Sequence, residues 1–406
     1  MKDRDVNRNL VIIKEPLFEV RDSPFTIAVR ESASARSVYS LLIALHIIYA
    51  AYVHLLWKHF PDVYQADVSS IKRVVSSLHI CLLLEIALVA SVTTCTLLTF
   101  RWKCFPAFLV QSFAVIGLPL AVVRYGYVPE LVAGFVMMEQ VRFIFKSISL
   151  VVEVKHCGHQ PTIKSIVYFL FAPTLVYQPE YPKSNSRDWS KILVWSIETT
   201  CMAVTFMLLI SQMLVPAFRD EGKVEVTGTR WLEQLRASLV IGAYQMLVVG
   251  YTMLHIQQNW YAEVLCFGDR RFYRDWMSSM HPIDFARRWN LIVHTWILRY
   301  VYGPMMAKTG SRIFSLLSVF MISFMSHDYV LNVAGNIFFP YFTMSIIQLV
   351  LATPVILLLV KAVNRFPIIA SLLSRNNVPF LTMQLIASAW AVYSYSCHYY
   401  RTINAQ

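Results

Sequence analysis

The chain has 406 residues, of which 57% are hydrophobic and 15% are charged, and its formal net charge at pH 7 is +12. An ordinary soluble domain carries about 25% charged residues, so this composition excludes a typical soluble globular protein. Several apolar runs reach the roughly 20 residues that a helix needs to cross a bilayer. A membrane barrel would instead show short alternating segments. The sequence therefore predicts an all-α, polytopic membrane protein.

The excess of lysine and arginine fits residues that flank membrane helices on the cytosolic side. A nucleic-acid groove is the alternative, but no basic stretch is interleaved with aromatic residues, so we expect no nucleic-acid partner. The seven cysteines form no CxxC pair, which argues against a disulfide framework. The run His156-Cys157-Gly158-His159 lacks a second ligand pair of the zinc-finger type, so we expect no metal site there.

Residues 1–37 mix both charge signs and contain no apolar core, so we expect a cytosolic N-terminal segment without a signal peptide. A single membrane domain is expected over residues 38–400, followed by a short tail at 401–406. The candidate membrane segments are 38–57, 76–100, 105–123, 128–152, 191–216, 234–256, 290–303, 313–335, 337–361 and 379–398. The short segment 290–303 contains His294 and Arg299, so we expect it to lie among other helices.

The positions of the basic residues predict the orientation, because cytosolic loops carry the excess of lysine and arginine. Basic residues gather in the loops after the second, fourth and sixth segments, on the same side as the N-terminus. The loop 217–233 on the other side balances Arg219, Lys223 and Arg230 against acidic residues that include Asp220, Glu221 and Glu225. We therefore expect the N-terminus and the long loops 153–190 and 257–289 to be cytosolic, and long loops on a rigid scaffold often carry function.

Four stretches bear chemistry-related side chains. In chain order they are YFLFAPTLVY at 168–177, FYRDW at 272–276, WNLIVHTW at 289–296 and SFMSHDY at 323–329. The last stretch places His327 in an apolar helix, where ionisable groups are expensive and usually line a cavity. A histidine exchanges protons near neutral pH, so His327 is the leading candidate for the chemistry of this protein.

In this order the four stretches resemble the membrane-bound O-acyltransferase family, and within it the branch of sterol and diacylglycerol acyltransferases. That branch carries an FxFAPTLxY stretch, an FYxDWWN motif, a WN…VHxW helix and an apolar helix that ends in SxxxHEY. The resemblance extends from about residue 40 to about residue 400. Two positions depart from it: Met277-Ser278 stands where the branch has Trp-Asn, and Asp328 stands where it has glutamate.

The resemblance implies a bundle of about nine transmembrane helices around a cavity, homodimers or higher oligomers, and acyl transfer from acyl-CoA in the endoplasmic reticulum membrane. It implies that His327 is the general base and that Asn290 donates to the oxyanion or orients the imidazole. Helix N-capping is the other common use of an asparagine at such a position. The residues implied to bind acyl-CoA, a co-substrate and not a cofactor, are Phe272, Tyr273, Arg274, Asp275, Trp276, Arg287, Trp289, His294, Arg312 and Ser323.

Helical spacing refines these assignments. His294 follows Asn290 by four residues and His327 follows Ser323 by four, so each pair shares a helix face. Asp328 is turned by about 100° from His327, which favours a salt bridge or a helix-end contact over proton chemistry. The remaining histidines, His255 among them, have no supporting neighbours along the sequence, and we predict no role for them.

The acceptor alcohol is predicted from weaker resemblances. The stretches Val176–Lys183, Val38–His46 and Phe338–Pro340 look closer to the sterol branch, whereas Gly303–Met305 resembles the diacylglycerol branch. We therefore expect an acyl-CoA:sterol O-acyltransferase, with a diacylglycerol or long-chain alcohol acceptor as the nearest alternative. A second alternative is a weakly active or non-catalytic sterol or acyl-CoA binding relative. A transporter with a histidine proton relay is a third, but the paired halves and interrupted helices of many transporters are absent from the sequence.

Overall fold

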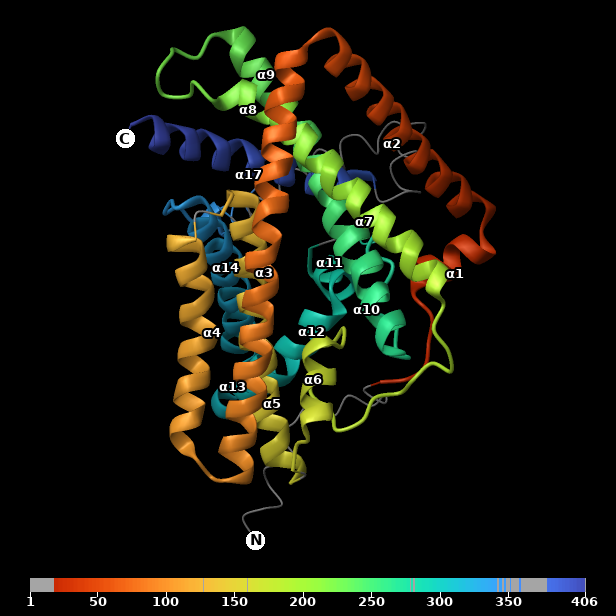
Figure 1. Ribbon diagram of the computed structural model, residues 1–406, viewed down its shortest axis with the longest axis vertical. Helices are drawn as coiled ribbons and strands as arrows, with labels where there is room; N and C mark the ends of the chain where they lie inside the picture. The colour runs from red at the N-terminus through yellow and green to blue at the C-terminus, as the bar shows by residue number, and fades with distance from the viewer. Residues whose placement is uncertain are drawn as a thin grey trace.

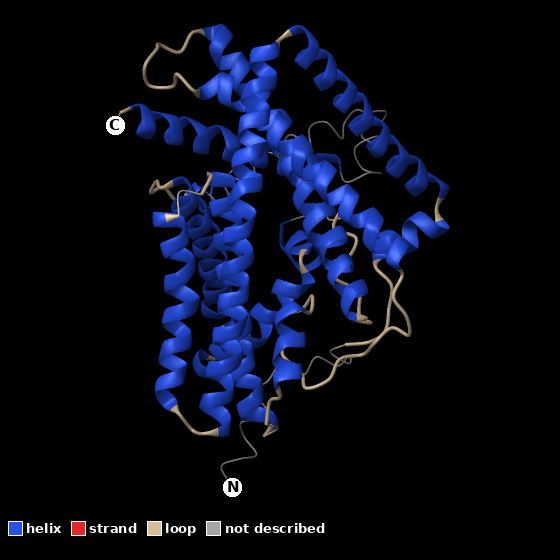
Figure 2. Cartoon of the chain, in the orientation of Figure 1, coloured by secondary structure: helices blue, strands red, loops and turns tan. Residues whose placement is uncertain are grey.

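The computed structural model describes residues 18–405, apart from 127, 159, 278, 280–281 and most of the range 342–377. Within that last range it describes residues 343, 344, 347, 351 and 358. The described part of the chain is built from helices, and its only extended pairing consists of isolated bridges (Figure 2). The prediction of an all-α protein is therefore confirmed.

The helices follow the chain in an order that the sequence largely predicts. They are α1 (Pro24–Glu31), α2 (Ala33–His59), α3 (Pro61–Arg101), α4 (Phe105–Tyr125), α5 (Glu130–Cys157), α6 (Ile163–Phe171), α7 (Trp189–Leu209), η2 (Ile210–Leu214), α8 (Val215–Phe218), α9 (Gly228–Leu247), η3 (Val248–Ile256), α10 (Gln257–Leu265), α11 (Pro282–Trp289), α12 (Leu291–Ile297), η4 (Leu298–Tyr302), α13 (Gly303–Thr309), α14 (Arg312–Gly335) and α17 (Val378–Asn404). The η elements are π-helical turns within longer helices, and such turns occur frequently at functional sites.

Six helical stretches of the described chain are long and apolar enough to cross a membrane. They are Tyr39–His59, Tyr64–Arg101, Pro106–Tyr125, Trp189–Phe218, Gly228–Leu265 and Arg312–Gly335. The predicted segments 128–152 and 379–398 are also helical, as α5 and α17. The segment 337–361 lies mostly outside the described residues. A polytopic membrane protein is thus confirmed, while the number of nine spanning helices stays a prediction.

The helices form two groups that lean toward each other (Figure 1). In one group α3, α4, α5 and α14 stand side by side, and neighbouring members of the group contact one another. In the other group α7, α9 and α10 are tilted, and α17 packs along α9. The helix α2 lies along the outer edge, and α6 and α12 occupy the region between the groups (Figure 1). This places the third motif stretch, which contains α12, between the two groups.

Two predicted boundaries are wrong for the same physical reason. Helix α3 begins at Pro61 and not at 76, because its polar first turns continue the helix beyond the apolar run. The predicted loop 257–289 begins with α10, which runs to Leu265. Its polar residues Asn259 and Glu263 are buried and hydrogen-bonded, although hydropathy alone reads them as loop residues. The short helix α1 also lies within the predicted N-terminal segment.

Three segments that the charge pattern places on one side of the membrane pair with one another. The bridge between Arg21 and Asp269 joins the N-terminal segment to the loop after α10, and the bridge between Lys183 and Phe267 joins that loop to the segment after α6. Since paired backbones must lie together, the structure confirms that these three segments share one side of the protein.

Candidate active site

One hydrophobic cluster unites the four motif stretches. Its buried members include Phe169 and Tyr177 from the first stretch and Phe272 from the second. Trp289 of the third stretch and Tyr329 of the fourth pack against the same cluster. Residues of all four stretches therefore belong to one packed cluster, although up to 160 residues separate them along the chain.

The FYRDW loop is anchored by its first two residues and exposes the next two. Phe272 and Tyr273 are buried, whereas Arg274 and Asp275 are exposed. Burial raises the pKa of the Tyr273 phenol to about 12, so the hydroxyl stays protonated near neutral pH. Phe272 and Tyr273 thus hold the loop from inside, and Arg274 is the member of this loop that can reach a phosphate from outside.

This loop is tied directly to the helix pair that carries the third stretch. The backbone N–H of Leu291 donates to the carbonyl of Phe272 over 2.9 Å. The Trp276 and Trp289 rings meet edge to face with centroids 4.7 Å apart. Gly250 of η3 makes room for them, since a Cβ there would lie 3.1 Å from the Trp276 ring. The two tryptophans therefore fill a fixed space between the loop and η3.

Asn290 caps the N-terminus of α12. Its Oδ1 accepts a hydrogen bond from the backbone N–H of Val293 over 3.1 Å, which satisfies one of the amides that a helix start leaves unpaired. The capping bond uses the amide oxygen, and the amide Nδ2 keeps its capacity to donate. Capping and donation to an oxyanion are therefore compatible. His294 follows one turn later on the same face and is half-buried.

His327 lies in α14, and its side chain is exposed, so a bound substrate can reach it. Its Nδ1 lies 2.7 Å from the carbonyl oxygen of Ser323. A carbonyl can only accept, so Nδ1 carries the hydrogen and Nε2 carries the lone pair of the neutral ring. Ser323 thus orients the imidazole through its backbone carbonyl, a contact that the sequence does not indicate.

Asp328 turns to a different environment, as the helical spacing predicts. It is buried, and its Oδ2 accepts from the backbone N–H of Thr343 over 3.2 Å and from the Thr343 hydroxyl. It therefore fixes the start of the helical segment at 341, where the side chain acts as a helix-end acceptor.

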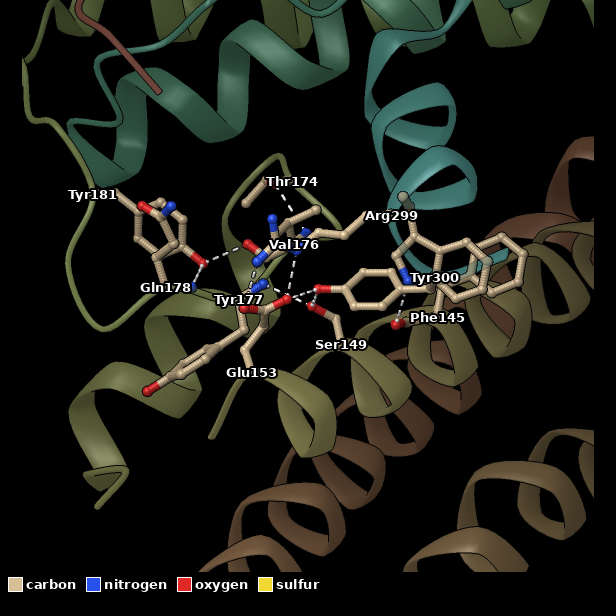
Figure 3. Close-up of polar contacts among 11 residues, drawn as sticks. Phe145, Ser149, Glu153, Thr174, Val176, Tyr177, Gln178, Tyr181, Arg299 and Tyr300 are labelled. Carbon is tan, nitrogen blue, oxygen red and sulfur yellow. Dashed lines mark hydrogen bonds and ion pairs between the residues drawn. The ribbon is translucent and has the colours of Figure 1, made fainter. Parts of the chain in front are cut away.

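A buried polar network links α5 to the helix that follows α12 (Figure 3). Arg299 pairs with Glu153 in a fork, with Nε 2.6 Å from Oε1 and Nη2 2.9 Å from Oε2. The Tyr300 hydroxyl donates to the same carboxylate over 2.6 Å. Ser149 lies 2.9 Å from the Tyr300 hydroxyl and accepts from the Tyr177 backbone N–H over 2.8 Å. This network fixes the first motif stretch and the helical turn after the third stretch against the same helix.

Two further side chains of α5 complete the scaffold. Lys146 donates to the carbonyls of residues 169, 170 and 172 over 2.6 to 3.0 Å, and so it caps the end of α6. Gln140 donates to the carbonyl of Val115, which Pro119 leaves without its usual helical donor, and to the next carbonyl. Gln140 Oε1 also accepts from the Tyr329 hydroxyl over 2.5 Å. The helix of His327 is therefore tied to α4 and α5 two residues beyond the histidine.

The predicted arginines differ in their surroundings. Arg274, Arg287 and Arg312 are exposed, as phosphate-binding residues must be. Arg288, by contrast, pairs with Asp284 over 2.8 Å and accepts from the Arg274 backbone N–H through its own carbonyl. Both contacts of Arg288 therefore stabilise the conformation of the loop. Contact of Arg274, Arg287 and Arg312 with acyl-CoA stays a prediction.

His255 is the residue that sequence reasoning missed. It is buried in η3, and its Nδ1 lies 2.9 Å from the Ser23 hydroxyl, 2.9 Å from the Tyr273 hydroxyl and 3.2 Å from Asn259 Nδ2. The expectation that it has no supporting neighbours is therefore wrong. Of these three partners Asn259 is near in sequence, four residues after His255, and Tyr251, four residues before it, stacks on its ring with centroids 5.6 Å apart. These two helical spacings are the signals that the sequence offered.

One cavity in the described part of the chain lies between α4 and α5, away from these residues. It measures about 300 Å³ and is lined by one face of α4 and one face of α5, including Gln111 and Ser147. No residue of the four motif stretches lines it. Across the described residues, no three histidine, cysteine or acidic side chains gather as metal ligands.

Comparison with known proteins matches this arrangement. The family model for membrane-bound O-acyltransferases covers residues 130–352, a range that contains all four motif stretches. Human sterol O-acyltransferase 2 is 29% identical over 245 residues, which are 57% of this chain and 47% of the relative. Sterol O-acyltransferase 1 of Cricetulus griseus is 29% identical over 247 residues, and sterol O-acyltransferase 2 of Mus musculus is 30% identical over 219 residues. The chain spans slightly less than half the length of these curated relatives.

Proposed function

Because this chain belongs to the membrane-bound O-acyltransferase family, we propose that it transfers a fatty acyl group from coenzyme A to the hydroxyl of a membrane sterol. The observation that carries the proposal is the single hydrophobic cluster that unites the four motif stretches, with an exposed His327 whose Nε2 carries the lone pair. A steryl ester and free coenzyme A are the products.

The reaction needs a base, because an alcohol is a weak nucleophile at neutral pH. In the proposed step, Nε2 of His327 takes the proton of the acceptor hydroxyl while the oxygen attacks the thioester carbonyl. The carbon–sulfur bond then breaks, and the leaving thiolate takes the proton back from the imidazolium. General base catalysis of this kind accelerates a reaction by about 10²–10⁴-fold. The bond from Nδ1 to the Ser323 carbonyl holds the ring in the tautomer that this step requires.

The thioester carbonyl gains negative charge during the attack, and Asn290 is the proposed donor to it. The capping bond to Val293 holds its side chain through the oxygen, so Nδ2 is preoriented at the start of α12. One such donor contributes about 10²–10³-fold in rate in other acyl transfers. The exposed Arg274, Arg287 and Arg312 are proposed to meet the coenzyme A phosphates, since a guanidinium pairs well with phosphate.

A sterol acceptor is supported by the relatives, which are sterol O-acyltransferases by name. Diacylglycerol or a long-chain alcohol would use the same step, and the resemblance of Gly303–Met305 to the diacylglycerol branch keeps that acceptor as the alternative. Homo-oligomers and location in the endoplasmic reticulum membrane are further proposals that rest on the family.

The two departures from the motifs bear on the second alternative, a non-catalytic binding relative. Asp328 accepts hydrogen bonds from Thr343, so its shorter side chain alters a helix-end contact, and the bond from the His327 imidazole to the Ser323 carbonyl is present beside it. Met277 is exposed, at 57% of its surface, and lies outside the packed part of the loop; Ser278 lies outside the described residues. The proposed base thus keeps its orienting bond to Ser323 in a chain that carries both departures, which favours an active enzyme.

The experiment is an acyl-transfer assay on the purified protein in lipid nanodiscs. Labelled oleoyl-CoA is supplied with cholesterol, diacylglycerol or a long-chain alcohol, one at a time. We expect labelled steryl ester with cholesterol and little product with the other two. Triacylglycerol or wax ester instead would change the acceptor and keep the mechanism. Binding of oleoyl-CoA without any ester would contradict the enzymatic proposal and favour the binding relative.

A further inference from the structure

The chain immediately before α1 lies along the loop that leads into FYRDW. We call residues 18–23 the N-terminal strap. Arg21 forms a two-pronged ion pair with Asp269, with Nε 2.8 Å from Oδ1 and Nη2 2.8 Å from Oδ2. The backbones pair as well, because Arg21 N–H donates to the Gly268 carbonyl and Arg270 N–H donates to the Arg21 carbonyl, each over 3.0 Å. The strap therefore contacts the loop through both side chain and backbone.

The loop is held between the strap and a second segment. Gly268 N–H donates to the Pro182 carbonyl over 2.8 Å on the other edge of the loop. A Cβ at Gly268 would lie 3.0 Å from both the Pro182 oxygen and Cγ2 of Val20. Phe18 also packs edge to face against Phe267, with ring centroids 6.0 Å apart. The strap thus approaches the loop closely at Gly268, where the Val20 side chain and the Pro182 carbonyl leave no room for a larger side chain.

The last residue of the strap, Ser23, contacts Tyr273, the second residue of FYRDW. Ser23 is 1% exposed, and its hydroxyl lies 3.2 Å from the Tyr273 hydroxyl and 2.9 Å from Nδ1 of His255. The backbone N–H of Phe25 donates to the same Tyr273 hydroxyl over 3.3 Å. The carbonyl of Phe272, which precedes Tyr273, accepts a hydrogen bond from the backbone N–H of Leu291, and Leu291 is the first residue of α12. A continuous chain of bonded residues therefore runs from the strap to the helix that Asn290 caps.

We propose that the N-terminal strap holds the FYRDW loop in the conformation that binds acyl-CoA, with Arg21 and Ser23 as positioning residues. This inference rests on the proposed function in one respect, namely that the loop receives acyl-CoA. Ordering a loop loses conformational entropy, and a loop that is ordered beforehand does not lose it again when the ligand binds. The strap therefore raises the affinity for acyl-CoA and does not change the geometry of His327 or of the acceptor site.

The test compares Arg21→Ala and Ser23→Ala with Arg30→Ala. Arg30 is a matched control because it is exposed and its ion pairs, with Asp22 near the end of the strap and with Glu31 in α1, involve no residue of the loop. In nanodiscs, hydrogen–deuterium exchange of residues 266–276 reports loop order, and a non-hydrolysable acyl-CoA thioether reports binding. We expect faster exchange in this loop for the two strap variants. Their Kd and KM for acyl-CoA should rise about tenfold, as for a lost hydrogen bond to a charged group.

Other quantities separate positioning from general damage. The strap variants should keep the wild-type kcat and KM for the acceptor, and Asp269→Asn should add nothing to Arg21→Ala. Arg21→Lys keeps the charge without the planar fork and should give an intermediate Kd. The proposal is overturned if loop exchange and Kd stay at wild-type values, or if Arg30→Ala shows the same changes. Since exchange and binding need no turnover, a wild type that forms no ester would refute the proposed function and leave this test in force.

Discussion

The fork between Arg299 and Glu153 gives the most quantitative prediction about this scaffold. Glu153 is 5% exposed, and its carboxylate accepts two bonds from Arg299 and one from Tyr300. Arg299→Leu leaves that carboxylate buried with the tyrosine hydroxyl as its remaining partner in this network. Removal of one member of a buried pair costs about 3–5 kcal/mol, because the remaining charge is uncompensated. We expect that loss in the free energy of unfolding.

The assay is reversible unfolding in mixed micelles with increasing SDS fraction, followed by tryptophan fluorescence. The double variant Glu153→Leu/Arg299→Leu removes both charges, and we expect it to recover most of the loss because a hydrophobic pair of similar volume often replaces a buried ion pair at little cost. Arg219→Ala is the control, since its pair with Asp220 is exposed and such pairs contribute about 0–1 kcal/mol. An Arg299→Leu loss below about 1 kcal/mol, or a double variant no more stable than the single one, would refute the reasoning.

Three more substitutions test separate parts of the site. Gly250→Ala places a methyl group 3.1 Å from the Trp276 ring, and such overpacking costs about 1–3 kcal/mol. We therefore expect weaker acyl-CoA binding in an equilibrium titration. Wild-type affinity would show that the two tryptophans are not constrained by Gly250. Gln140→Leu removes the partner of the Tyr329 hydroxyl, so we expect a loss of about 1–3 kcal/mol in unfolding and a lower kcat, whereas an unchanged kcat would uncouple this bond from the reaction. Asp328→Ala removes a helix-end acceptor and should cost about 0.5–2 kcal/mol while kcat stays near wild type; a loss of kcat as large as that of a His327 variant would give Asp328 a role in proton transfer.

The sequence predicts the parts of this fold that follow from local pattern. The apolar runs place most membrane helices correctly, because a helix in lipid must be apolar over its whole length. The face shared by Ser323 and His327, and the different direction of Asp328, follow from the helical period. The same-side assignment of three segments follows from basic residues alone, and the bridges at Arg21 and Lys183 confirm it.

The parts that the sequence does not predict depend on pairing between distant residues. Arg21 and Asp269 are far apart in sequence, and nothing local to either one indicates the other. Ser23 and Tyr273 are not close to His255 along the chain, so its contacts with them appear only in three dimensions. The polar end of α10 is predicted as a loop for a related reason. The burial of Glu263 depends on its ion pair with Arg270 and on its hydrogen bond from the Asp188 backbone N–H, and both partners lie outside the helix.

In the proposed mechanism, His327 removes the proton from an acceptor alcohol. The most direct measurement is the rate of steryl ester formation from labelled oleoyl-CoA and cholesterol by wild type, His327→Ala and His79→Ala, with oleoyl-CoA binding measured on the same preparations. His79 is the control because it is also an exposed histidine on a long helix. The account predicts that His327→Ala binds oleoyl-CoA with wild-type affinity and forms ester at least about 100-fold more slowly, while His79→Ala resembles the wild type. Ester formation by His327→Ala at the wild-type rate would contradict the account.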